Sequence, residues 1–178
     1  MALNNLDWNK KMKVDKFRQV IRQLPAKMGN MAERHFKESF RAKGFDDNGL
    51  QRWPPRKAAG RGSLMIQSGA LKRSIHRSRM TANSVTITAG DGKVPYAKIH
   101  NEGGTTHPTV TAKMIAFAYH MSKGAGTPEQ AKMWRGIAHT RKNKLTVNIP
   151  QRKFMGRSKS LDRKTIEMIK HDINSIFQ

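Results

Sequence analysis

The sequence of residues 12–43 is MKVDKFRQVIRQLPAKMGNMAERHFKESFRAK, and its periodicity decides the fold class. Apolar and aromatic side chains recur there at steps of three and four, which is the repeat of one helical face. They are Val14, Phe17, Ile21, Leu24, Met28, Met31, His35, Phe36 and Phe40. The pattern predicts one long amphipathic helix that packs this stripe on a core. Pro25 lies within it and lacks a backbone donor, so we expect a kink or a break there.

Two more segments follow regular patterns. The pattern predicts a second amphipathic helix over roughly residues 161–177, and the negative charge of Asp162 suits its positive N-terminal end. We expect its inward face to be Leu161, Ile166, Ile169, Ile173 and Ile176. Residues 71–89 predict a β-hairpin, because β-branched side chains alternate after a turn at 81–84.

The rest of the chain is less regular. Glycine and proline interrupt residues 44–66, which predicts an extended basic loop, with Trp53 docked on the body of the fold. A short helical turn is expected over 94–101, ended by Gly103. Residues 145–149 alternate as a strand that Pro150 stops.

Residues 105–144 form a variable insertion in this interpretation. Thr111 can cap a short helix through His120, although the apolar residues of that segment fit a strand as well. Thr127, Pro128 and Gln130 make a capping box that opens a helix to about His139.

These elements predict an α+β fold in a single domain over residues 1–178. A mostly antiparallel sheet is packed by the long N-terminal helix and the C-terminal helix, with long basic loops between them.

The net charge of the chain indicates what kind of partner it has. The chain has 35 Lys and Arg against 12 Asp and Glu, a formal net charge of +23, and no acid occurs from Asn48 to Gly90. A compact fold with this field repels itself unless something negative lies close by. Nucleic-acid phosphates or an acidic protein surface would supply that charge, but charge alone does not read base sequence.

Other classes of protein fit poorly. The chain has no cysteine, which excludes a disulfide framework and a cysteine-based zinc site. No signal-like run opens it, and nowhere do roughly 18 apolar residues follow one another. We therefore expect a protein of a cytoplasm-like compartment with no membrane segment.

Little in the sequence points to catalysis. The seven histidines include no pair at the spacing that places two ligands on one helical face. His100, Glu102 and His107 come closest to a metal cluster, and a metal nuclease could begin this way, but an inward-facing His100 with an exposed Glu102 fits better. We expect no catalytic residue, no metal site and no cofactor, and therefore no enzyme.

Three segments together resemble a known family. They are Ser68-Gly69-Ala70-Leu71-Lys72-Arg73-Ser74, Tyr96-Ala97-Lys98-Ile99-His100-Asn101-Glu102-Gly103 and Ile149-Pro150-Gln151-Arg152-Lys153-Phe154-Met155-Gly156. With Trp53-Pro54-Pro55 before them and an amphipathic helix after them, this order resembles the tailed-bacteriophage virion-morphogenesis, or tail-completion, family. Ser68 stands where that family usually has Thr, and residues 105–144 match less clearly.

The resemblance implies assembly rather than turnover. It implies a structural virion protein of the head–tail connector, or neck, in the neck or tail of the particle and in the host cytoplasm during assembly. Copies would form a homo-oligomeric ring, of roughly six or twelve, around the DNA channel. Its partners would be portal or adaptor proteins, the tail terminator or tail tube, and genomic DNA bound without sequence preference.

Two sets of residues carry these expectations. The residues expected to face the channel or dock on a partner are Arg52, Arg56, Lys57, Arg61, Lys72, Arg73, Arg77 and Arg79. Residues expected to hold the fold are Trp53, Gly69, Leu71, Tyr96, Ala97, Gly103, Pro150, Arg152 and Phe154. Tyr96 and Ala97 should pack a turn closely, and Arg152 is a candidate for a paired structural arginine. The alternative function, on charge alone, is a cytosolic non-specific DNA-binding protein.

Overall fold

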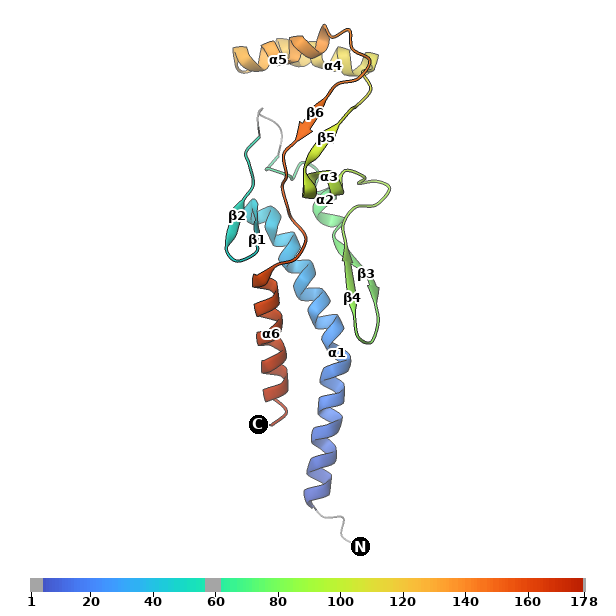
Figure 1. The fold of residues 1–178 in the computed structure, drawn as a ribbon, viewed down its shortest axis with the longest axis vertical. Coiled ribbons are helices and arrows are strands. Elements are labelled where there is room, and N and C mark those ends of the chain that lie inside the picture. The colour runs from blue at the N-terminus through green and yellow to red at the C-terminus, as the bar shows by residue number, and fades with distance from the viewer. Residues whose placement is uncertain (1–4, 57–61, 178) are drawn as a thin grey trace.

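The computed structural model describes residues 5–56 and 62–177. Its elements, in chain order, are α1 (Asn5–Ala42), β1 (Gly44–Asp46), β2 (Leu50–Arg52), α2 (Ala70–Arg73), β3 (His76–Met80), β4 (Val85–Thr88), α3 (Ala97–Glu102), β5 (Gly104–Thr106), α4 (Ala112–Lys123), α5 (Pro128–Ala138), β6 (Val147–Ile149) and α6 (Lys159–Asn174). The expected α+β class is confirmed. Figure 1 shows an elongated molecule with α1 as its longest element.

α1 is one continuous helix that contains Pro25. The proline removes a single backbone donor, and a long helix accommodates that loss by bending rather than by ending. Figure 1 shows the helix changing direction about half-way along. The sequence left a kink or a break open at Pro25, and the structure shows a kink.

The core lies beside the C-terminal half of α1. Phe40 is fully buried, and its ring centroid lies 5.5 Å from that of Trp53 and 5.3 Å from that of Phe154. Phe45 of β1 and Ile75 are also fully or almost fully buried in this cluster. Trp53 docks on the body of the fold as expected, because its indole nitrogen donates to the carbonyl of Lys153 at 2.6 Å.

The N-terminal half of α1 does not join this core. Val14, Phe17 and Ile21, expected to face inward, are 48, 42 and 40% exposed. The predicted stripe is continuous, but the rest of the chain covers it only from about Leu24 onward. The expectation of burial is therefore wrong for its first three members.

α6 runs antiparallel beside the middle of α1 (Figure 1). Lys27 pairs with Asp172 at 2.7 Å, and the Thr165 hydroxyl lies 3.7 Å from the Met31 sulfur. The face of α6 that carries Thr165 and Asp172 therefore contacts α1. Ile166 lies off that face and is 52% exposed, contrary to the expected inward position.

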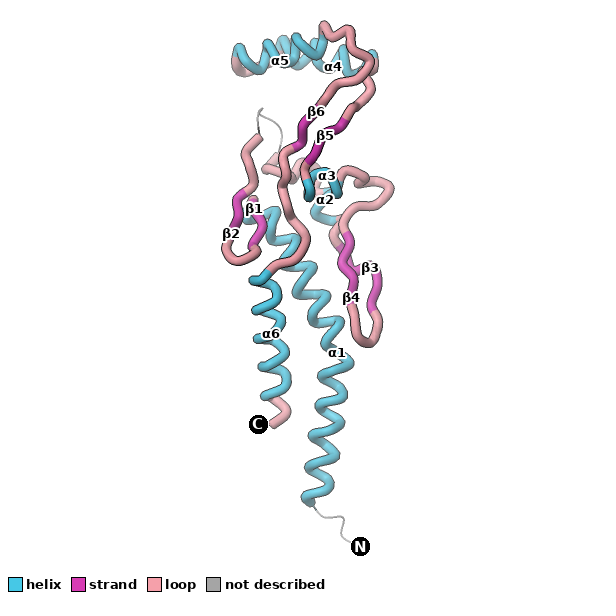
Figure 2. Tube along the Cα trace, in the orientation of Figure 1, coloured by secondary structure: helices cyan, strands magenta, loops and turns pink. Residues whose placement is uncertain are grey.

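The strands are antiparallel as expected, but they form three separate two-stranded sheets (Figure 2). β1 pairs with β2, β3 with β4, and β5 with β6. α1 contacts both β1 and the β3–β4 hairpin, so a helix surface rather than a further strand covers them. Gly29 allows the hairpin to approach closely, since a Cβ there would lie 2.8 Å from a Val85 methyl carbon.

Two segments differ locally from the expected elements. Part of the expected loop 44–66 is the β1–β2 hairpin, whose turn is closed by the Gly49 amide donating to the Asp46 carboxylate at 3.3 Å. The first limb of the expected hairpin 71–89 begins as α2, and only residues 76–80 form its strand. The second limb is confirmed as β4.

β5 and β6 carry α4 and α5 away from the core, at the end opposite the N-terminus (Figure 1). We call α4 and α5 the arm. Thr111 and Thr127 cap its helices as expected, accepting from the amides of Met114 and Gln130. Residues 112–123 are thus a helix and not a strand. Within the described part of the chain, no helix is both long and apolar enough to cross a bilayer.

Candidate functional site

The three sequence motifs meet at one pocket. It has a volume of about 400 Å³ and lies between α2, α3 and the segment after β6. We call it the motif pocket. Its lining residues are Arg56, Leu64, Met65, Ile66, Gln67, Ser68, Gly69, Ala70, Leu71, Tyr96, His100 and Arg152. Residues from Arg56 to Arg152 thus contribute to a single site.

The first motif enters the pocket through a tight turn. Gly69 has φ 77°, a left-handed conformation that glycine adopts without strain, and it directly precedes α2. The Ser68 hydroxyl accepts from the Ala70 amide at 3.3 Å. Leu71 is buried on the core side, so α2 is fixed to the fold while Ser68 and Gly69 face the pocket.

Arg152 is the charged centre of the pocket and is only 8% exposed. Its Nε donates to the carbonyl of Pro54 at 3.0 Å, and its Nη2 donates to that of Pro55 at 3.1 Å. In the described ranges no carboxylate lies within ion-pair distance of it. It is thus a paired structural arginine, but it is paired with carbonyl groups.

Electrostatics at Arg152 are unfavourable to its charge. Burial lowers its pKa, and the positive charge of Arg56 lowers it further. An arginine in a protein nevertheless keeps its proton at neutral pH. The pocket therefore holds a buried cation next to a second cation.

His100 adds an unsatisfied polar atom. Its Nδ1 is buried without a hydrogen-bond partner among the described residues, and its ring meets that of Tyr96 edge-on at 5.7 Å. Burial lowers the His100 pKa, and the charge of Arg152 acts in the same direction, so the ring is neutral. An unpaired buried nitrogen costs about 1–3 kcal/mol.

The second and third motifs are joined by a residue to which the sequence assigned no role. The Asn101 side-chain oxygen accepts from the amides of Phe154 and Met155 at 2.9 and 3.0 Å. Ala97 is buried as expected, whereas Tyr96 is 40% exposed and packs less closely than expected. Gly103 ends α3, and a Cβ there would lie 2.9 Å from the Gln151 amide nitrogen.

The residues expected to face the channel or a partner lie on several elements. Arg52 is exposed on β2, Arg73 at the end of α2, and Arg79 on β3. Arg77, also on β3, lies 3.5 Å from the Glu33 carboxylate of α1, and Lys72 is partly buried. Arg56 lines the motif pocket and donates to the carbonyls of Gly62 and Ser63. Lys57 and Arg61 lie outside the described residues.

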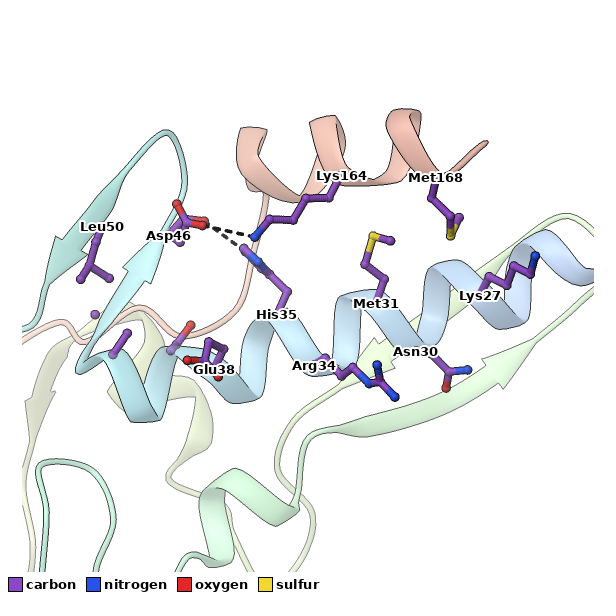
Figure 3. A pocket seen from close by; sticks show the side chains of 13 residues that line it. Lys27, Asn30, Met31, Arg34, His35, Glu38, Asp46, Leu50, Lys164 and Met168 are labelled. Atoms are coloured by element: carbon purple, nitrogen blue, oxygen red, sulfur yellow. Dashed lines mark hydrogen bonds and ion pairs between the residues drawn. The ribbon is translucent and has the colours of Figure 1, made fainter. Parts of the chain in front are cut away.

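A larger pocket, of about 520 Å³, lies between α1, β1 and α6 (Figure 3). The Asp46 carboxylate lies 3.7 Å from the Lys164 ammonium and accepts from the Ser160 hydroxyl at 2.8 Å. The Ser160 hydrogen bond is the main cause of the lowered Asp46 pKa. His35 Nε2 lies 3.1 Å from the Asp46 carbonyl, and burial lowers the His35 pKa. These contacts tie three elements together, which makes this pocket a structural junction.

The described side chains provide little support for a metal-binding site. No group of three His, Cys, Asp or Glu that could hold a metal ion occurs within residues 5–56 and 62–177. His107, the second histidine considered for a metal, instead lies 3.5 Å from the Thr146 hydroxyl.

A family model described as "Phage virion morphogenesis family" matches residues 2–174. The chain belongs to the phage virion morphogenesis family. Its match covers the arm as well as the core and all three motifs. No curated protein and no solved structure was found to match the chain.

Membership of the phage virion morphogenesis family gives the chain a structural or assembly role in building the phage particle. In that light, the hydrogen bonds among its motifs hold a framework together. They join the loop before the motif pocket, α3 and the segment leading to α6.

Proposed function

We propose that this chain is a tail-completion protein of the phage neck, which joins heads to tails as a ring around the DNA channel. The observation that carries the proposal is the family match over residues 2–174. The partners would be the portal or adaptor on one side and the tail terminator or tail tube on the other. The protein would reside in the neck of the virion.

The charge of the chain supports a place beside the genome. A net charge of +23 on 178 residues attracts phosphates without selecting a sequence, which suits a passage through which all of the DNA must move. Copies that contact one another through two different surfaces close into a ring when the rotation between them permits it.

Exposed apolar side chains support assembly. Val14 and Phe17 lie uncovered on one face of the N-terminal half of α1, and on the arm Phe117, which meets the Trp134 ring edge-on, is 55% exposed. Exposed apolar surface that is grouped rather than scattered marks contacts with other proteins. The two groups lie at opposite ends of the molecule, as head-to-tail or two-sided contacts require (Figure 1).

The basic loop offers a direct test. Deletion of Arg56 to Gly62 should leave the monomer folded, because Trp53 and the core pack independently of it, and should abolish the joining of heads to tails. The measurement is complementation of a phage that lacks this gene, scored by infectious yield and by electron microscopy of free heads and tails.

A matched variant replaces residues 57–61 by a Gly-Ser linker of equal length, which keeps Arg56 and the chain length. Loss of joining in both variants assigns the effect to the loop itself. Unchanged infectious yield from the deletion would contradict the proposal.

The second candidate is a cytosolic non-specific DNA-binding protein, which the charge alone favours. It predicts tight, strongly salt-dependent binding of duplex DNA by the free monomer. The neck protein predicts weak DNA affinity together with self-assembly or binding to a portal complex. Sedimentation with DNA and with portal complexes at several salt concentrations separates the two.

A further inference from the structure

We propose that the motif pocket is a receptor for a carboxylate on another protein chain, held by Arg152 and Arg56 with His100 as a further donor. The occupant is an acidic segment of an assembly partner, entering with a side-chain or a terminal carboxylate. The identity of that partner rests on the proposed function, whereas binding itself is a property of the purified protein.

The charge of Arg152 favours an anion in the pocket, since no carboxylate of the described residues lies within ion-pair distance of it. Arg152 and Arg56 both line it, and its lining contains no Asp or Glu. Carbonyl groups satisfy part of the Arg152 fork but do not neutralise its charge. A buried cation without a counterion is costly, and a carboxylate that accepts from guanidinium groups removes that cost.

The hydrogen-bonding groups of the pocket also suit a carboxylate. The buried Nδ1 of His100 has no partner in the described part of the chain, and the pocket lies beside this ring. In the tautomer that carries the proton on Nδ1, the neutral ring donates one hydrogen bond. Because a carboxylate accepts on two oxygens, it can engage a guanidinium and this nitrogen together.

The shape of the pocket favours a protein carboxylate over a DNA phosphate. Leu64, Met65 and Ile66 give the pocket apolar lining, and Arg152, which lines the same pocket, is almost fully buried. A backbone phosphate of duplex DNA is flanked by sugars on a convex surface and contacts exposed cations best. A side chain or a chain end protrudes and carries an apolar stem, which matches a recess of about 400 Å³.

The composition of this chain favours an acid from another chain. There are only 12 Asp and Glu, and several of them are engaged elsewhere. Glu33 pairs with Lys37 and Arg77, Asp172 pairs with Lys27, and Asp46 accepts from Ser160. A partner with an acidic segment therefore complements a chain that has little acid to offer.

The test is an NMR titration of the full-length, isotope-labelled protein that follows the side-chain signals of His100 and Arg152. N-acetyl-leucine supplies a terminal carboxylate, and N-acetyl-glutamate α-amide supplies a side-chain carboxylate. N-acetyl-leucinamide and N-acetyl-glutamine amide are their neutral counterparts. We expect at least one acid to shift both signals saturably and neither neutral compound to do so. The acid that binds more tightly shows whether a chain end or a side chain is the natural occupant.

Variants locate the binding. Arg56→Gln leaves the hydrogen bonds from Arg152 to the carbonyls of Pro54 and Pro55 in place. It should lower the affinity for the acid by roughly tenfold, the usual effect of losing a charged hydrogen bond. Arg79→Gln removes the same charge from an exposed site on β3 and should leave the affinity unchanged. His100→Phe keeps an aromatic ring beside Tyr96 but removes the donor, and should weaken binding by severalfold.

Three results would overturn the inference. One is the absence of saturable shifts with either acid. Another is an equal loss of affinity in Arg79→Gln and Arg56→Gln, which would reduce the effect to general charge. The third is displacement of the acid from the pocket by a short duplex DNA, which would make phosphate the ligand. Failure of head–tail joining in phage leaves these binding results unaffected, so the two proposals fail separately.

Discussion

Phe40 has no exposed surface, and its ring packs against those of both Trp53 and Phe154. It thereby joins α1 to the segments before α2 and before α6. Three segments that are distant in sequence meet at this ring. We therefore expect the stability of the core to depend more on Phe40 than on any exposed apolar side chain.

Phe40→Ala should lower the free energy of unfolding by about 3–5 kcal/mol, the usual cost of emptying a buried phenylalanine site. Urea denaturation followed by circular dichroism measures this loss. Phe117→Ala removes the same side chain from an exposed site on the arm and is the control. Equal losses in the two variants would show that Phe40 is not central to the core.

His35 predicts a pH dependence of stability. Its pKa is lowered in the fold, so the folded state binds fewer protons than the unfolded state as pH falls toward and below the ordinary histidine pKa of about 6.5. Stability is therefore complete above that pH and declines below it, by at most about 1.4 kcal/mol per pH unit for one proton. Urea midpoints at pH 7.5 and about 5.5 measure the decline.

His35→Gln keeps a donor for the Asp46 carbonyl but does not titrate, so the difference between the two midpoints should shrink. His100, whose pKa is also lowered, contributes in the same direction and over the same pH range, and the paired carboxylates of Asp46 and Asp172 contribute in the same direction at lower pH. A slope unchanged in His35→Gln would assign the effect to those groups.

At the scale of elements, the start of α6 is fixed by Ser158. Its hydroxyl accepts from the Leu161 amide at 3.0 Å as an N-cap and donates to the Asp46 carbonyl at 2.7 Å. One buried hydroxyl therefore both begins the helix and ties it to β1.

Ser158→Ala should cost about 2 kcal/mol of stability, roughly half from the lost cap and half from the lost hydrogen bond to the Asp46 carbonyl, which keeps only His35 as a side-chain partner. Thr127→Ala removes a cap of the same geometry from α5, which is exposed on the arm, and should affect the core little. Fluorescence of backgrounds that keep only Trp53 or only Trp134 reports on core and arm separately. The reverse order of the two effects would contradict this interpretation.

Elements that depend on local sequence were predicted well. The cap at Thr127 and the end of α3 at Gly103 follow from residue chemistry within a few positions, whereas the segment after Thr111 was left open between the helix that it forms and a strand. The β1–β2 hairpin was missed because its turn depends on Asp46 bonding to Gly49 inside a glycine-rich segment. Whether other parts of the chain cover the apolar face of α1 does not depend on local sequence either. For that reason Phe17 was wrongly predicted to be buried.

The candidate site shows the same division. The three motifs could be found in the sequence, but their convergence could not, because Arg152 reaches carbonyls 97 and 98 residues earlier in the chain. Asn101 lies within the second motif, yet no neighbouring residue in the sequence indicates that its side chain accepts from the amides of Phe154 and Met155. Those contacts are long-range and have no sequence periodicity.

On the scale of the whole molecule, apolar surface is exposed at both ends while the core lies between them. Val14→Ser/Phe17→Ser should leave the free energy of unfolding within about 0.5 kcal/mol of the parent, since both side chains are already exposed. Under the proposed ring, the same variant should lose self-association. Analytical ultracentrifugation over a concentration series measures it.

Lys11→Ser/Gln19→Ser is the matched control, because it changes exposed residues of the same half-helix away from the apolar stripe. Self-association that persists in Val14→Ser/Phe17→Ser and disappears in the control would place the contact on the polar face instead.

With only two strands in each sheet, every strand in the described part of the chain has one side that lacks a strand neighbour. Backbone amides and carbonyls along such a side can pair with an extended segment of a different polypeptide, whatever its side chains. Joints made in this way tolerate sequence drift on both sides, since main-chain pairing specifies spacing rather than residue type.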